Sequence, residues 1–110
     1  MKNYIQPGEN LTVTAPADVT SGDGVLIENL FGVAQTTVLN GEDVVLVRRG
    51  VFTLPKLAAQ AWVVGAGVYW DDGNAHCTTT ATGNKLIGLA AEAAANPSET
   101  GTVLLDGAVR

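Results

Sequence analysis

Residues 40–55 run Asn40-Gly41-Glu42-Asp43-Val44-Val45-Leu46-Val47-Arg48-Arg49-Gly50-Val51-Phe52-Thr53-Leu54-Pro55. Asn-Gly is a strong turn signal, because both residues tolerate a positive φ. The wholly apolar run Val44–Val47 predicts a central strand or one buried on both faces. Gly50 separates this run from a second strand, either as a tight turn or as a glycine bulge within one long strand, and Pro55 ends the segment.

The sequence on both sides of this stretch continues the pattern of short strands and turns. Leu11, Val13 and Ala15 alternate with threonines, which predicts a strand with one apolar face. Val25–Ile27 and Phe31–Ala34 are close enough to pair as a hairpin or to continue as one strand across a bulge. Asp71–Asn74 is expected to be the turn of another hairpin, and Lys56–Ala61 is long enough for one helical turn.

The composition favours strands throughout the chain. Valine, isoleucine and threonine make up 29 of the 110 residues, and 13 glycines and 4 prolines divide the chain into short runs. Lys85–Ala93 is alanine-rich and could be helical, but Gly88 interrupts it and the later run Thr102–Leu105 needs an antiparallel partner, so we interpret it as a strand. The fold predicted is all-β: a small β-barrel or β-sandwich of short antiparallel strands, one domain over residues 11–110, preceded by an extended N-terminal arm, residues 1–10.

The charge balance and the single cysteine exclude several classes of protein. Eleven acidic against six basic residues give a net charge of −5, which counts against a nucleic-acid partner. One cysteine excludes an internal disulfide and a multi-cysteine zinc site. No apolar stretch has the length of a signal peptide or a membrane span, so we expect synthesis in a cytoplasm and no membrane partner.

No motif predicts catalysis, a cofactor or a metal site. His76 and Cys77 are adjacent, so on a strand their side chains point to opposite faces and cannot form a dyad. Asp71-Asp72-Gly73-Asn74 lacks the glutamate and the flanking helices of a calcium loop. The Gly83–Lys85 segment lacks the other residues of a phosphate-binding loop, and Arg48-Arg49 is typical of a solvated strand end.

Three aromatic residues are candidates for a subunit interface: Trp62, Tyr69 and Trp70. Tyr69 and Trp70 are neighbours on a predicted strand, so they must face opposite sides of it. One of the two is expected in the core, and the outward one is available to a second subunit, because aromatic residues are enriched at interfaces.

Several segments resemble, in order, a family of small proteins from tailed phages and prophages. The matching segments are Met1–Gly8, Thr20–Leu26, Leu30–Ala34, Gly50–Lys56, Val68–Asp71 and Leu86–Ala90. Members often carry the label of a RecA/RadA-type phage recombinase but are now regarded as capsid cement, or head decoration, proteins. A recombinase needs a phosphate-binding loop and about twice this length, so the resemblance implies the cement role instead.

The resemblance implies a structural virion protein that binds the major capsid protein on the outer surface of the expanded capsid, as a homotrimer that could form only on the capsid. The arm is a candidate capsid-binding segment, with Lys2, Tyr4, Ile5 and Pro7, because it precedes the regular alternation and could add a strand to a shell-protein sheet. Two other classes stay open. An exposed aromatic platform at Trp62 or Trp70 would favour a host-surface or glycan-binding module on the virion, and a defined polar pocket would favour a small enzyme whose site is assembled from scattered residues.

Overall fold

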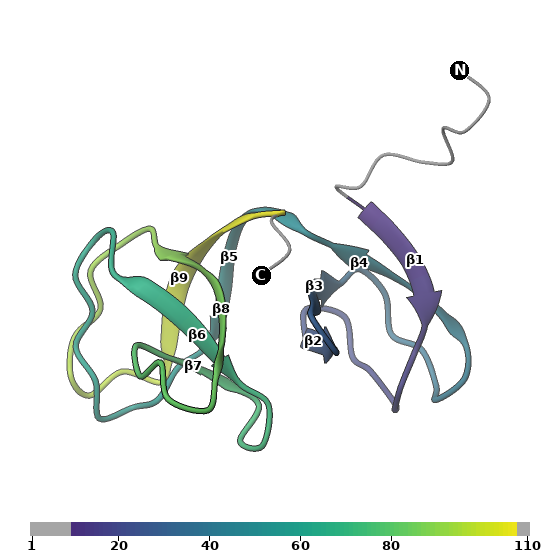
Figure 1. Ribbon diagram of the computed structural model, residues 1–110, viewed down its shortest axis with the longest axis horizontal. Coiled ribbons are helices and arrows are strands. Elements are labelled where there is room, and N and C mark those ends of the chain that lie inside the picture. The colour runs from purple at the N-terminus through teal and green to yellow at the C-terminus, as the bar shows by residue number, and fades with distance from the viewer. Residues whose placement is uncertain (1–9, 108–110) are drawn as a thin grey trace.

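A computed structural model describes residues 10–107 and contains two antiparallel sheets and no helix in this range (Figure 1). The first sheet has the order β1-β4-β3-β2. It is built from β1 (Asn10–Thr14), β2 (Gly24–Ile27), β3 (Leu30–Ala34) and β4 (Asp43–Val47). The second sheet has the order β5-β9-β8-β6-β7. It is built from β5 (Arg49–Pro55), β6 (Gly67–Asp71), β7 (His76–Thr78), β8 (Lys85–Ala90) and β9 (Thr100–Asp106).

The two sheets are not closed into a barrel, so the architecture is sandwich-like, one of the two forms predicted. The second sheet curls until β7 reaches the end of β5 through one isolated parallel bridge, between Lys56 and Cys77. The sheets form two groups of strands that lie side by side along the longest axis of the molecule, which measures 47 Å (Figure 1). We call residues 10–47 the first lobe and residues 49–107 the second lobe.

Arg48 is the link between the lobes. Strands β4 and β5 are separated by this one residue, but they belong to different sheets and do not pair with each other. Gly50, with a φ of 128°, lies inside β5 opposite Leu105, so it makes no turn between paired strands. The apolar run Val44–Val47 is central as predicted, because β4 lies between β1 and β3.

Four tight turns of the same construction precede β2, β4, β6 and β8. In each, the backbone N–H of the fourth residue donates to the carbonyl of the first, and the glycine at the third position has a φ between 76° and 93°. The turns are Thr20–Asp23, Leu39–Glu42, Val63–Ala66 and Ala81–Asn84. The glycine hydrogen at these positions faces open space, so the backbone conformation, and not crowding, requires glycine there.

Each lobe has its own core. The buried residues of the first core are small and aliphatic: Ala15, Val19, Val25, Ala34, Val44 and Leu46. The second core is larger and contains both tryptophans with Leu54, Val68, Cys77, Ile87, Ala90, Val103 and Leu105. The β2–β3 hairpin joins the two, because Val33 belongs to the second core and the ring of Phe31 lies 5.1 Å from that of Trp70.

The predicted hairpins are confirmed, with two differences in detail. Strand β2 pairs with β3, and β6 pairs with β7 across the Asp71–Asn74 turn. The alanine-rich segment is a strand, but β8 ends at Ala90, where the chain turns away and Ala91 donates to the Thr102 carbonyl. The helical turn considered for Lys56–Ala61 is wrong, because Lys56 and Leu57 bond to Glu99 and Cys77 instead.

Candidate functional site

The histidine and the cysteine do not form a reactive pair. Cys77 on β7 is completely buried, and burial raises the pKa of its thiol to about 12. His76, its neighbour on the strand, instead places Nε2 3.7 Å from Oδ2 of Asp71 on β6. The thiol is therefore protonated at neutral pH and packs as a small apolar side chain.

The carboxylates of the Asp71–Asn74 turn are used by the fold itself. Asn74 donates to Asp71 from its side-chain amide at 2.8 Å and from its backbone N–H at 3.3 Å. These bonds, mainly the side-chain one, hold the pKa of Asp71 below its usual value. Asp72 accepts a hydrogen bond of 3.0 Å from Nε1 of Trp70. Within residues 10–107, no group of three or more His, Cys, Asp or Glu side chains could hold a metal ion.

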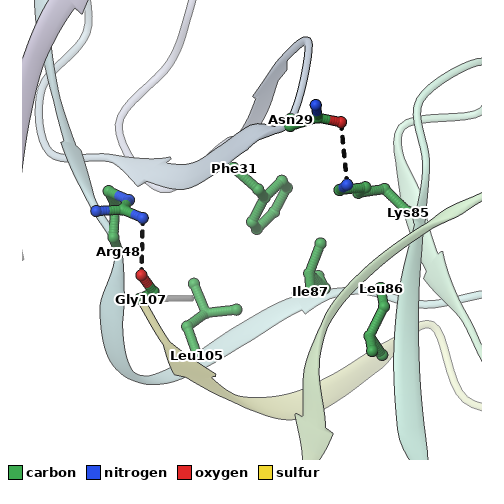
Figure 2. A pocket seen from close by; sticks show the side chains of 8 residues that line it. All are labelled: Asn29, Phe31, Arg48, Lys85, Leu86, Ile87, Leu105 and Gly107. Carbon is green, nitrogen blue, oxygen red and sulfur yellow. Dashed lines mark hydrogen bonds between the residues drawn. The ribbon is translucent and has the colours of Figure 1, made fainter. Parts of the chain in front are cut away.

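The junction between the lobes is tightly filled (Figure 2). The Phe31 ring lies between the lobes, and Nζ of Lys85 donates to Oδ1 of Asn29 at 3.0 Å. On the other side, Nη2 of Arg48 donates to the Gly107 carbonyl at 2.7 Å. The cavity left between them is only about 10 Å³, the space of one water molecule. The Lys85 bond therefore connects the two lobes, the Arg48 bond ties the linker to the second lobe, and this part of the junction has no room for a substrate.

A second, larger hollow of about 300 Å³ is lined mainly by the first lobe and also by Asp72 of the second lobe, and its lining includes three carboxylates, those of Asp18, Asp23 and Asp72. Asp18 accepts a hydrogen bond from the Asn40 backbone N–H at 2.8 Å, and Asp23 accepts one from that of Thr20 at 3.0 Å. Asp72 holds the indole of Trp70, as described above. The lining residues include neither a histidine nor a lysine, and each of the three carboxylates accepts a hydrogen bond within the fold.

The three aromatic residues predicted at an interface are divided between the core and the surface. Trp62 and Trp70 are only 2% and 3% exposed, and their indoles pack inside the second lobe. This corrects the prediction for these two residues, because a side chain buried in its own chain offers no surface to a glycan or a second subunit. Tyr69 is the outward member of its pair, half-buried on the other face of β6, and remains a candidate.

Two exposed apolar surfaces in the second lobe were not predicted from the sequence, and Leu39 in the first lobe is the one other exposed large apolar side chain among the described residues. Val51, Leu104 and Leu89 lie opposite one another on β5, β9 and β8, and they are 59%, 41% and 45% exposed. We call these three residues the outer row. The row continues to Gly67 on β6, the partner of Leu89, and the Tyr69 ring lies beside that glycine. Alternation with the buried residues Val103 and Leu105 is the sequence signal that could have revealed it.

The second apolar surface is the tip of the turn that precedes β6. Val63 and Val64 are 69% and 68% exposed, although Trp62 beside them is buried. The turn is held by hydrogen bonds from the Ala66 N–H to the Val63 carbonyl and from the Gly65 N–H to the Ala90 carbonyl. We call Val63 and Val64 the valine tip.

Charge is distributed unevenly between the lobes. The first lobe has five carboxylates and no lysine or arginine. All five carboxylates are exposed: Asp18, Asp23, Glu28, Glu42 and Asp43. The second lobe has five carboxylates and three cations, so its surface is much closer to neutral. The net negative charge of the protein is therefore concentrated on the first lobe.

The predicted capsid-binding residues Lys2, Tyr4, Ile5 and Pro7 lie outside the described residues. The first described residue, Asn10, begins β1, which is an edge strand of the first sheet.

Comparison with known proteins gives the family. No helix that could cross a membrane occurs in residues 10–107. No curated protein and no solved structure matches the chain. The family profile described as phage cement protein matches residues 5–105, which is nearly the whole chain and includes both lobes. This family is structural, and its members are capsid components of the virion. The chain belongs to the phage cement protein family.

Proposed function

We propose that this protein binds the outer surface of the expanded phage capsid and stabilises it against the pressure of the packaged DNA. The observation that carries the proposal is the family match over residues 5–105. The partner is the major capsid protein of the shell. The protein is made in the cytoplasm of the host bacterium and works on the virion.

The physical basis of this role is mass action. A protein that binds the expanded lattice but not its precursor stabilises the expanded state by an amount that grows with its concentration and affinity. Such a protein needs a rigid fold and a binding surface, and it needs no chemistry. The buried thiol and the turn-bound carboxylates described above fit that requirement, because they serve the fold.

The N-terminal arm is proposed to make part of the contact with the shell. Tyr4 and Ile5 would fill pockets while the backbone adds a strand to a sheet edge of the shell protein. Ordering nine residues costs roughly 1–2 kcal/mol each, so most of their hydrogen bonds must be made in the complex. Because the arm leads into β1, this contact would bring the acidic first lobe close to the shell, with the second lobe further from the arm.

Deletion of residues 2–6 tests the role of the arm. We expect the melting temperature of the free protein to change little and binding to heads to weaken at least tenfold. The double substitution Tyr4→Ala with Ile5→Ala, which keeps the length of the arm, should give most of the same loss. Equally tight binding by the deletion variant would show that the contact lies on the folded lobes.

The proposed function itself is tested with phage heads that lack the protein. Purified protein is incubated with expanded heads and with unexpanded precursor heads, and the bound fraction is measured after sedimentation. We expect saturable binding to the expanded heads and at least tenfold weaker binding to the precursors. Absence of saturable binding to expanded heads would overturn the proposal.

We further propose that the copies associate with one another on the capsid, as homotrimers at its local three-fold points. Closed symmetric assemblies suit these positions. The outward aromatic Tyr69 and the outer row beside it are surface available for such contacts.

A further inference from the structure

The second lobe has two apolar surfaces of different shape. The outer row is spread across three neighbouring strands of the sheet, whereas the valine tip belongs to a tight turn. A surface that binds its own equivalent gives a two-fold dimer, but two different surfaces that bind each other give a head-to-tail contact, which can close into a ring. The presence of two different apolar surfaces on one lobe therefore favours a head-to-tail contact.

The charges of the molecule indicate a second copy of this chain as the occupant. Two copies that met through their first lobes would bring ten exposed carboxylates together with no cation from those lobes. The outer row, in contrast, is bordered on one side by Arg49 opposite Asp106 and on the other by Thr53 opposite Thr102. The valine tip belongs to a stretch between Lys56 and Asp71 with no charged residue. These two surfaces can approach each other without repulsion between like charges.

The size of the surfaces indicates how strong the contact is. A contact between three partly exposed residues and two valines buries much less surface than the roughly 800 Å² per partner of a standard stable interface. Two small contacts per copy in a closed ring would be weak in solution. Binding of every copy to the same capsid surface would raise the local concentration of the copies, and the ring would then close.

We propose that the valine tip of one copy packs on the outer row of the next copy, beside Tyr69, in a head-to-tail ring. This contact rests on the proposed self-association and assigns a surface to it. Val64 would lie between Leu104 and Val51 of the next copy, with Leu89 on the side towards Tyr69.

Disulfide cross-linking tests the contact. The double variant Val51→Cys with Val64→Cys is oxidised in solution at about millimolar concentration and on saturated expanded heads. Within one chain, strands β9 and β8 lie between Val51 on β5 and the turn before β6 that carries the tip, so the two positions are not neighbours that an intrachain disulfide could join. The native Cys77 is fully buried, so the wild-type chain is the background control. We expect the double variant to give covalent species of several copies in at least one of the two settings.

The single variants distinguish the head-to-tail contact from a symmetric one. Val51→Cys alone and Val64→Cys alone should each give less than about a tenth of the cross-linked material of the double variant. Efficient dimers from a single variant would mean row-to-row or tip-to-tip pairing and would overturn the proposal. No cross-linked species above the wild-type background in either setting would also overturn it.

A charge exchange gives a second, independent measurement of the same contact. Val64→Lys should weaken self-association at least tenfold by sedimentation, and Leu104→Glu should do the same. The two changes combined should recover most of the association, because each lysine then faces a glutamate of the next copy. No recovery in the double variant would overturn the contact.

If these variants still bind expanded heads, the proposed capsid function stands even when the contact is wrong. If the wild type fails to bind heads, that function fails by itself.

Discussion

The two lobes of this protein are both antiparallel sheets, but they differ in core and in surface. The first lobe buries only small aliphatic side chains and carries five exposed carboxylates without a cation. The second lobe buries both tryptophans, is closer to electrical neutrality and exposes the outer row and the valine tip. Similar secondary structure therefore supports two different kinds of surface, one acidic and one apolar.

This difference suggests a division of roles in a cement protein. A large core holds the second sheet and the turn with the valine tip in place, as the proposed contacts between copies require. The first lobe follows the N-terminal arm directly, so it is the part that the arm would bring to the shell. Substitutions in the second core and at the junction should therefore change stability more than substitutions on the surface.

The largest effect is expected from Trp62→Ala in the second core. Trp62 is one of the largest fully buried side chains, and its ring covers Gly101 on β9. Its loss leaves a cavity that should lower the free energy of unfolding by about 3–5 kcal/mol. Urea denaturation followed by circular dichroism measures this change. Val63→Ala at the exposed neighbouring position is the control and should change stability by less than about 0.5 kcal/mol. Similar effects of the two changes would contradict the burial of Trp62.

Phe31→Ala tests the coupling between the lobes. Phe31 is partly buried at the junction against Trp70, so its removal should cost about 2 kcal/mol, less than for a fully buried ring. Both tryptophans lie in the second lobe, so their fluorescence reports that lobe, whereas circular dichroism reports both. We expect the urea unfolding curve followed by fluorescence and the one followed by circular dichroism to coincide in the wild type and to separate in Phe31→Ala.

Phe52→Ala is the matched control for this measurement. Phe52 also packs against the second core, but it lies on β5 within the second lobe. The variant should lose similar stability while its two curves stay together. Coincident curves in Phe31→Ala would mean that the junction does not depend on this ring.

A smaller effect is expected from Lys56→Met. The Lys56 side chain is 4% exposed, and its Nζ donates to the carbonyls of Leu57 at 2.8 Å and Ser98 at 3.0 Å. Methionine fills a similar volume but leaves these acceptors without their donor, which should cost about 1–2 kcal/mol. Lys85→Met, which removes an exposed hydrogen bond between the lobes, should cost less than about 1 kcal/mol. Thermal melts of both variants measure the difference in stability. An unchanged melting temperature in Lys56→Met would mean that the bonds from Nζ to these carbonyls do not stabilise the fold.

The smallest effect concerns the turn between β6 and β7. Asn74→Ala removes the main cause of the lowered pKa of Asp71, so that pKa should rise towards its usual value in an NMR titration. His76→Asn should raise it less, because His76 contributes less than Asn74. A carboxyl with a lowered pKa stabilises the fold above its unfolded pKa, and this contribution is lost as the pH falls through the folded value. The wild type should therefore lose slightly more stability than Asn74→Ala on acidification. An unchanged Asp71 pKa in Asn74→Ala would mean that the hydrogen bond does not set it.

The sequence predicted the local structure better than the arrangement of the sheets. Turn glycines and alternating residues give the hairpins, because these signals depend on backbone φ and on neighbours in the chain. The division into lobes depends on Arg48. The apolar run before this residue belongs to the first sheet, and the apolar run after it belongs to the second sheet. Nothing in the local pattern of residues 44–54 distinguishes a strand that stays in its sheet from one that changes sheets.

The candidate site was harder to predict than the fold for a similar reason. Trp62, Val63 and Val64 are consecutive apolar residues, but the turn at Gly65 turns the indole inward and leaves both valines exposed. The outer row is assembled from β5, β8 and β9, which are far apart in the chain and meet only through strand pairing. The alternation of side chains along a strand predicts that one of Tyr69 and Trp70 faces outward, and in the structure the outward residue is Tyr69.

A three-dimensional map of expanded heads decorated with the purified protein tests the central claim most directly. We predict density for the protein on the outer surface of the shell, with the first lobe and the arm next to the major capsid protein. The second lobes of neighbouring copies should meet around a local three-fold point, with the valine tip of each on the outer row of the next. Undecorated shells at saturating protein concentration, or isolated copies with the second lobe against the shell, would contradict this arrangement.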